Sequence, residues 1–134
     1  MRQGGVLITL GNASALALDG GLAHDVRRAR VKDVFTPGSE LRVRFPRPEH
    51  PLAYGYGETT SVFRENRPVY DVRRPQRGHV VMQWGTKPRS DEDEAEPAGP
   101  DADKKEKREP LVVSGGIKGA TELSGKPAVL DIPT

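Results

Sequence analysis

The sequence of 134 residues contains no cysteine. This excludes disulfide scaffolds, cysteine-ligated zinc, thioredoxin-type redox chemistry and every cysteine nucleophile. Aromatic residues make up 5%, and no apolar run approaches the roughly 20 residues that a membrane-spanning helix needs. The first residues also lack the apolar stretch of a secretory signal, so the cellular location is unknown from the sequence and no membrane association is expected.

Hydrophobic residues make up 34% of the chain, and Leu, Ile, Val and Phe together number 29. This is enough for one thin core, so residues 1–134 are expected to form a single small domain. The net charge of +2 arises from 21 basic and 19 acidic residues, which are unevenly distributed. Composition therefore has to be examined by segment.

A charged segment interrupts the chain at residues 86–110. It contains four prolines, nine acidic and six basic side chains, and alanine supplies its only apolar side chains. Such a segment cannot bury enough surface to offset the entropy cost of ordering, so we expect a disordered insertion within the domain. A docking tail or a nucleic-acid mimic is the functional interpretation; a solvated surface loop explains the same composition without a partner.

The apolar run Val6–Leu10, bounded by Gly5 and Gly11, is typical of a strand that is covered on both faces. It favours a parallel sheet flanked by helices. A short helix over residues 13–18, capped by Asn12 and ended by the pair of glycines at 20 and 21, is expected to follow.

The segment Leu41–Phe45 alternates apolar and arginine residues, which predicts a strand with one buried face. Residues 22–35 fit neither period and are interpreted as a loop or a short helix. Gly and Pro bound four more expected strands, at residues 69–72, 79–84, 111–113 and 128–132. The predicted fold class is α/β. Because buried-type strands lie near both ends, we expect a sheet that is incomplete at both ends, as in a fragment of a larger protein.

Metal and phosphate sites are poorly supported. His24, His50 and His79 lack metal-ligand spacing, so a zinc site would need all three to converge from distant segments. The run Gly55–Thr60 begins like a dinucleotide fingerprint but ends in Thr60 where the third glycine belongs. The pair at 125–126 resembles the end of a phosphate loop that lacks its first glycine. We therefore expect no metal and no cofactor in this chain.

No catalytic residue is predicted either. Ser114 follows an apolar run and precedes two glycines, a place where α/β enzymes often keep a nucleophile, yet Val112 breaks the GxSxG pattern. The spacing of Glu58, Glu65 and Asp71 does not indicate an acid and base pair.

An arginine-rich region with nearby aromatic residues is the remaining candidate site. Arginine beside aromatics can hold phosphates and stacked bases, although the normal solvent face of a strand looks the same, and nucleic-acid binding is the less expected outcome. The basic residues are Arg42, Arg44, Arg47, Arg64, Arg67, Arg73, Arg74 and Arg77, and the aromatic ones are Tyr54, Tyr56, Phe63 and Tyr70.

An ordered set of phrases suggests a family. HPLAYGY at residues 50–56 is preceded by PGSELRV, followed by TSVF and RPVY, and framed by GGVLITLGNASALAL and LVVSGGIKGATELSGKPAVLDIP. Together these phrases resemble the C-terminal region of large bacterial zinc carboxypeptidase-like peptidases, in which a class I glutamine amidotransferase-like domain follows the peptidase domain. The resemblance covers nearly the whole chain outside the charged segment.

The resemblance implies a flavodoxin-like layered sheet, and a parent protein that uses zinc to release C-terminal residues from peptides and is periplasmic or secreted. The zinc ligands and catalytic glutamate of such peptidases belong to the upstream domain and match nothing here, and glutaminase chemistry would need a cysteine. The expected function is therefore that of a non-catalytic accessory domain whose partner is the upstream peptidase domain. The alternative is a stand-alone arginine-rich module that binds anionic ligands or nucleic acid.

Overall fold

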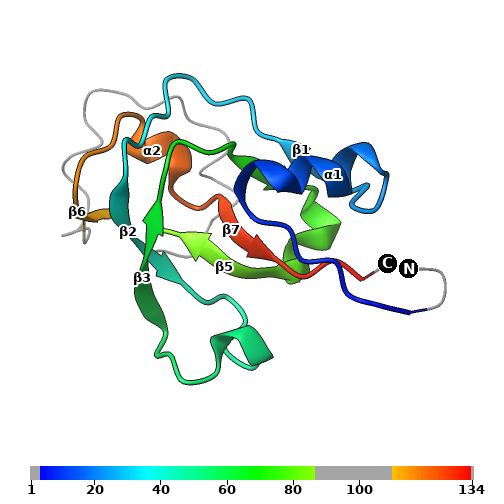
Figure 1. Ribbon diagram of the computed structural model, residues 1–134. Coiled ribbons are helices and arrows are strands. Elements are labelled where there is room, and N and C mark those ends of the chain that lie inside the picture. The colour runs from blue at the N-terminus through cyan, green and yellow to red at the C-terminus, as the bar shows by residue number, and fades with distance from the viewer. Residues whose placement is uncertain (1–3, 87–109, 134) are drawn as a thin grey trace.

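The computed structural model describes residues 4–86 and 110–133, which form a mixed α/β structure with few helices (Figure 1). Short strands outnumber helical turns in this part of the chain. In chain order the elements are η1 (Gly11–Ala13), α1 (Ser14–Asp19), β1 (Val26–Arg28), β2 (Ser39–Arg44), η2 (Pro51–Ala53), β3 (Thr59–Arg64), β4 (Tyr70–Val72), η3 (Arg74–His79), β5 (Val80–Trp84), β6 (Val112–Ser114), α2 (Ala120–Leu123) and β7 (Pro127–Leu130).

The main sheet has five strands in the order β3-β2-β5-β7, and β6 also pairs with β2. Every pairing among these strands is antiparallel. Strands β1 and β4 form a separate antiparallel ribbon. The predicted parallel sheet is therefore wrong for the described residues. Among the described strands, the only sequence-adjacent ones that pair, β2 and β3, are joined by residues 45–58, which contain the short turn η2 rather than the long helical crossover that parallel pairing requires.

Strand β2 confirms the alternation seen in the sequence. Leu41 and Val43 are fully buried, Phe45 is 1% exposed, and the intervening arginines are only partly covered. On one side β2 pairs with the whole of β3, from Ser39 opposite Arg64 to Arg44 opposite Thr59. Strand β3 was not predicted, because its two threonines and one serine interrupt the apolar alternation by which a strand is recognised in a sequence.

The core lies between the main sheet and α2. Leu123 from α2 is fully buried and clusters with Leu41, Val43, Val69 and Trp84. Helix α2 was not predicted, since four residues are too few to show a helical period. The helix follows Gly119, whose φ of +76° is a left-handed conformation that glycine adopts without strain.

The expected strand at Val6–Leu10 is absent, and this prediction is wrong. The segment carries no regular structure, and its side chains stand in solvent: Val6 is 90% exposed, and Ile8 and Leu10 are each 79% exposed. No described strand pairs with it, so its backbone gains no ladder of hydrogen bonds. An apolar composition does not by itself produce a strand where no neighbour is supplied.

The first helix confirms part of the prediction. It spans Ser14–Asp19 and ends at Gly20 and Gly21, where the Leu22 N–H donates to the Ala17 carbonyl at 2.9 Å. Asn12 is not its cap, however, because it lies inside the preceding turn η1 and its side chain makes no cap hydrogen bond.

Residues 22–35 contain β1, so their interpretation as a loop or short helix is wrong over 26–28. Val26 lies opposite Val72 in the β1–β4 ribbon, and this pairing, which spans 46 positions, decides the local conformation. The four remaining predicted strands are confirmed as β4, β5, β6 and β7 with ends shifted by one or two residues.

The predicted disordered insertion at 86–110 falls outside the described residues except for its two ends. Its flanking strands, β5 and β6, both pair with β2, at Val43–Arg44 and at Glu40–Leu41. None of the helices in the described part of the chain is long and apolar enough to cross a membrane.

Candidate functional site

The three histidines lie apart and do not form a metal site. Among residues 4–86 and 110–133, no group of three or more His, Asp or Glu side chains could hold a metal ion. His24 lies beside Gly21, and His79 ends η3, where its carbonyl accepts a hydrogen bond from the Asp131 N–H at 3.0 Å.

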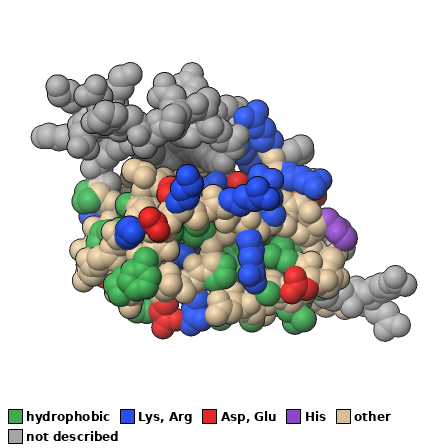
Figure 2. All heavy atoms as spheres, turned by 90° about the horizontal axis from the view of Figure 1, so that it is seen from above, with side chains coloured by type: hydrophobic (Ala, Val, Ile, Leu, Met, Phe, Trp, Pro, Cys, Tyr) green, Lys and Arg blue, Asp and Glu red, His purple; other side chains and the backbone are tan. Residues whose placement is uncertain are grey.

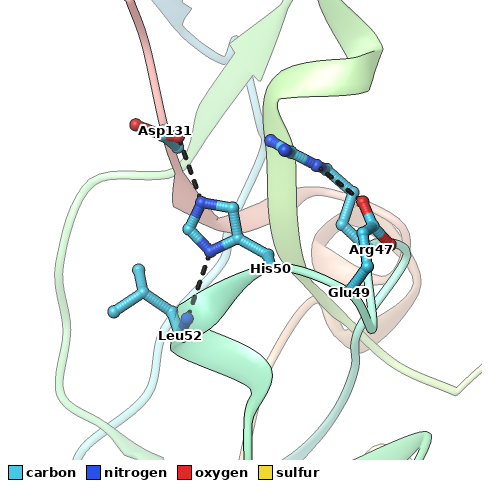
Figure 3. A network of polar contacts seen from close by, with 5 residues as sticks. All are labelled: Arg47, Glu49, His50, Leu52 and Asp131. Carbon is cyan, nitrogen blue, oxygen red and sulfur yellow. Dashed lines mark hydrogen bonds and ion pairs between the residues drawn. The ribbon is translucent and has the colours of Figure 1, made fainter.

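His50 is the histidine with a defined role (Figure 3). Its Nε2 lies 3.1 Å from Asp131 Oδ2, and its Nδ1 accepts a hydrogen bond from the Leu52 N–H at 3.2 Å. Because the backbone N–H occupies Nδ1, the proton resides on Nε2 and is donated to the carboxylate. Both ring nitrogens are therefore engaged, which leaves neither as a free base or metal ligand. The pair fastens η2 to the segment after β7.

Arg47 and Glu49 form the second part of this network, with Arg47 Nε 3.3 Å from Glu49 Oε1 (Figure 3). The pKa of the Glu49 carboxyl is lowered, first by a hydrogen bond with its own backbone and then by the hydrogen bond and charge of Arg47. Since the Glu49 carboxyl is exposed, this is a surface ion pair and contributes little to stability.

Ser114 lies at the exposed end of β6, and neither a histidine nor an aspartate within the described ranges hydrogen-bonds to its hydroxyl. The near-match to a dinucleotide fingerprint is the turn that leads from η2 into β3, with Gly55 at a φ of +86°. Lys126 follows α2 rather than preceding a helix, and its Nζ pairs with Asp71 at 3.2 Å. The three motifs are thus a strand end, a turn and a residue of an ion pair.

The predicted arginine surface is largely neutralised by carboxylates. Arg44 pairs with Glu58 at 3.5 Å, Arg73 pairs with Asp25 at 3.6 Å, and Arg67 pairs with Glu65. Of the aromatic side chains, Tyr56 stacks on Phe45, with ring centroids 5.4 Å apart.

Arg64 is the exception, because it is buried, with 5% of its surface exposed. Its Nη1 donates to Thr36 Oγ1 and to the Glu65 carbonyl at 3.0 Å, and its Nη2 donates to the Arg67 carbonyl at 2.5 Å. The guanidinium lies 5.7 Å from the centroid of the Trp84 ring. Burial lowers the pKa of Arg64. The side chain thus holds the backbone of residues 65–67 in place, a role that its position in the predicted basic set did not suggest.

Next to that backbone lies a groove of about 450 Å³, formed by the segments around 28–34 and 66–69 together with η1. Its polar lining residues, Asn12, Arg28, Asn66 and Arg67, are exposed, whereas its valines are half-buried or buried. A second hollow, of about 200 Å³, lies over β3, β5 and β7 and is lined mainly by apolar side chains such as Leu52, Tyr56 and Met82. Neither hollow could be predicted from the sequence, since the residues that line each one come from segments far apart in the chain.

Comparison with known proteins identifies no relative. No family model, no curated protein and no solved structure matches this chain. The function therefore has to be argued from the residues themselves.

Proposed function

We propose that this chain is a non-catalytic accessory domain of a zinc metallocarboxypeptidase-type protein, and that it packs against the peptidase domain of that parent. The resemblance of its ordered phrases to the C-terminal region of such peptidases supports the family assignment. In this proposal the parent's peptidase domain supplies the zinc, as the resemblance implies. No step of the parent's chemistry is assigned to this chain.

One observation carries the docking part of the proposal: the exposed apolar segment Val6–Leu10. Three of its side chains, those of Val6, Ile8 and Leu10, are 79% to 90% exposed. Full burial of an aliphatic side chain of this size stabilises by about 1.5–3 kcal/mol. A continuous stretch of such residues in solvent is typical of a surface that a partner covers.

The finer fold assignment belongs to the same proposal. A flavodoxin-like, class I glutamine amidotransferase-like domain needs a central strand covered by layers on both sides. Val6–Leu10 has the composition of such a strand. We propose that the parent protein supplies its neighbours and the covering layers, and that the antiparallel sheet forms one part of the larger domain.

The reading frame upstream of this sequence provides the first test, since it should encode a peptidase domain with an HxxE zinc motif. If it does, amide hydrogen exchange on the longer protein should show Val6–Leu10 protected, whereas the 134-residue chain alone exchanges there almost freely. An upstream frame without that motif would overturn the family assignment. Unprotected amides in the longer protein would overturn the docking segment.

Activity measurements on the chain alone supply a further test. The purified chain should neither release C-terminal residues from peptides nor retain stoichiometric zinc after dialysis. Peptidase activity that a chelator abolishes would contradict the assignment of a non-catalytic role.

The alternative function, a stand-alone module that binds anionic ligands or nucleic acid through the predicted arginines, has weaker support. Arg44, Arg67 and Arg73 already have carboxylate partners, and Arg64 is buried beneath the loop that it holds. Strong retention on a nucleic-acid column that weakens steeply with salt would favour this alternative over the accessory domain.

A further inference from the structure

We propose that the groove between residues 28–34 and 66–69 binds a small organic anion that carries an apolar body, with Arg28 as the main contact to the anionic head. This inference goes beyond the proposed accessory function and does not depend on it. It rests on the groove's shape, on its unused hydrogen-bond donors and on its fixed walls.

The size and lining suit such a ligand. The groove holds about 450 Å³, within the usual range for small-molecule sites. Val31, Val34 and Val69 give it an apolar floor, and Val69 is 6% exposed. The polar side chains of the groove are its more exposed ones, and the valines lie deeper. This division favours a ligand with one charged end and one apolar end.

The donors in the walls are available. The Arg28 side chain has neither a hydrogen bond nor an ion pair with any described residue, and the side-chain amides of Asn12 and Asn66 are likewise unengaged within the described ranges. Arg27, its neighbour on β1, instead pairs with Asp71 at 3.9 Å. Alternation along the strand places these two arginines on opposite faces. Arg28 therefore offers a guanidinium fork to an anion in the groove.

Charge around the groove is mostly positive. Arg30 and Lys32 continue the basic run beyond Arg28, and neither side chain pairs with a carboxylate among the described residues. Figure 2 shows Lys and Arg side chains gathered on the face seen from above, where the loop after β1 runs. The nearby carboxylates oppose an anion but are occupied: Glu65 pairs with Arg67, Asp33 pairs with Lys118 at 3.2 Å, and Glu122 accepts a hydrogen bond from the Lys32 N–H at 2.6 Å. An anionic head would thus be attracted to the Arg28 side of the groove.

The walls are held before any ligand arrives. The Ala29 N–H donates to the Val69 carbonyl at 2.8 Å, which joins the two segments. The buried Arg64 guanidinium holds the backbone of residues 65–67 through hydrogen bonds to the Glu65 and Arg67 carbonyls. Arg67 packs against η1, where a Cβ added to Gly11 would lie 3.3 Å from Arg67 Cδ. A preformed groove loses little entropy when it binds.

Amide chemical shifts of the 15N-labelled chain provide the test, with four probes: phenyl phosphate, benzoate, benzamide and inorganic phosphate. Phenyl phosphate or benzoate should shift the amides of residues 28–34 and 66–69, and whichever binds more tightly identifies the head group. Benzamide, which lacks the charge, and inorganic phosphate, which lacks the apolar body, should bind at least about tenfold more weakly.

Two variants of equal charge distinguish the groove from general electrostatics. Arg28→Gln should weaken binding about tenfold, because one hydrogen-bonded charge is lost. Arg27→Gln, on the opposite face of β1, should change it by less than about twofold. The dispersion of the amide spectrum verifies that each variant folds. The proposal is overturned if neither aromatic anion shifts the groove amides, if benzamide or inorganic phosphate binds equally well, or if the two variants weaken binding alike.

Discussion

Replacing Arg64 by alanine should strongly destabilise the chain, because one buried side chain joins three separate features. Its guanidinium donates to the Thr36 hydroxyl and to the carbonyls of Glu65 and Arg67, and it lies against the Trp84 ring. Thr36 is fully buried, and its own hydroxyl donates to the Glu65 carbonyl at 2.8 Å. Without the guanidinium, these acceptors would lose their charged donor.

The magnitude follows from opposing contributions. A hydrogen bond to a charged group contributes about 1.5–3 kcal/mol, and a cation–π contact contributes about 0.5–2 kcal/mol. Burying the charge costs several kcal/mol, and the lowered pKa of Arg64 reflects that cost. The variant recovers this desolvation cost. A net loss of about 2–4 kcal/mol in the free energy of unfolding is therefore expected, a large share of the 5–15 kcal/mol typical of a domain.

Urea denaturation followed by tryptophan fluorescence measures this loss directly, because Trp84 is the only tryptophan of the chain and is 9% exposed. Arg64→Lys is the informative partner variant: it keeps the charge but loses the planar fork, so it should lose about 1–3 kcal/mol. Arg27→Gln, on the surface, should change stability by less than about 0.5 kcal/mol. An Arg64→Ala variant within 1 kcal/mol of the parent chain would refute the assigned role.

Three further outcomes are expected. Leu123→Ala should destabilise the chain by about 2–5 kcal/mol in the same assay, because Leu123 is fully buried. Leu52→Ala should destabilise it by less than about 0.5 kcal/mol, because Leu52 is 58% exposed. Equal losses would contradict the placement of the core. His50→Ala should lower the free energy of unfolding by about 1–2 kcal/mol, since two hydrogen bonds are lost. It should also speed hydrogen exchange of the Leu52 amide, and an unchanged exchange rate would argue against the Nδ1 contact. A carboxyl-detected pH titration should find the pKa of Glu49 below that of an ordinary glutamate, and Arg47→Gln should raise it partway, while its backbone hydrogen bond remains. Because the folded-state pKa is the lower one, the small stabilisation from Glu49 is present above its unfolded pKa and disappears as the pH falls through the folded value.

The parts of the fold that could be predicted are those in which the signal is local. The alternation over Leu41–Phe45 and the punctuation of β4, β5, β6 and β7 by Gly and Pro identified these strands within one or two residues. Strand β1 could not be found in this way, because Arg27 and Arg28 carry no apolar period and only the distant partner β4 makes the segment extended. Strand direction is equally non-local, so the parallel arrangement was predicted from composition and was wrong.

The candidate groove shows the same limit. Arg28, Asn66 and Arg67 are ordinary polar residues in the sequence, and the first two lie 38 positions apart. Their convergence depends on the Ala29–Val69 hydrogen bond and on the buried Arg64. A buried arginine that binds backbone carbonyls has no local sequence signature, because surface arginines on strands look identical.

The exposed segment Val6–Leu10 is informative because the described sheet offers it no adequate place. An edge position beside β3 or β7 would cover its backbone on one side and, at most, one face of its side chains. In an extended strand, Val6, Ile8 and Leu10 would lie on one face and Leu7 on the other. Edge pairing alone would therefore leave apolar surface in water. A partner that accommodates this segment has to cover both faces, which is why the proposal requires a central strand between layers of the parent protein rather than simple extension of the existing sheet.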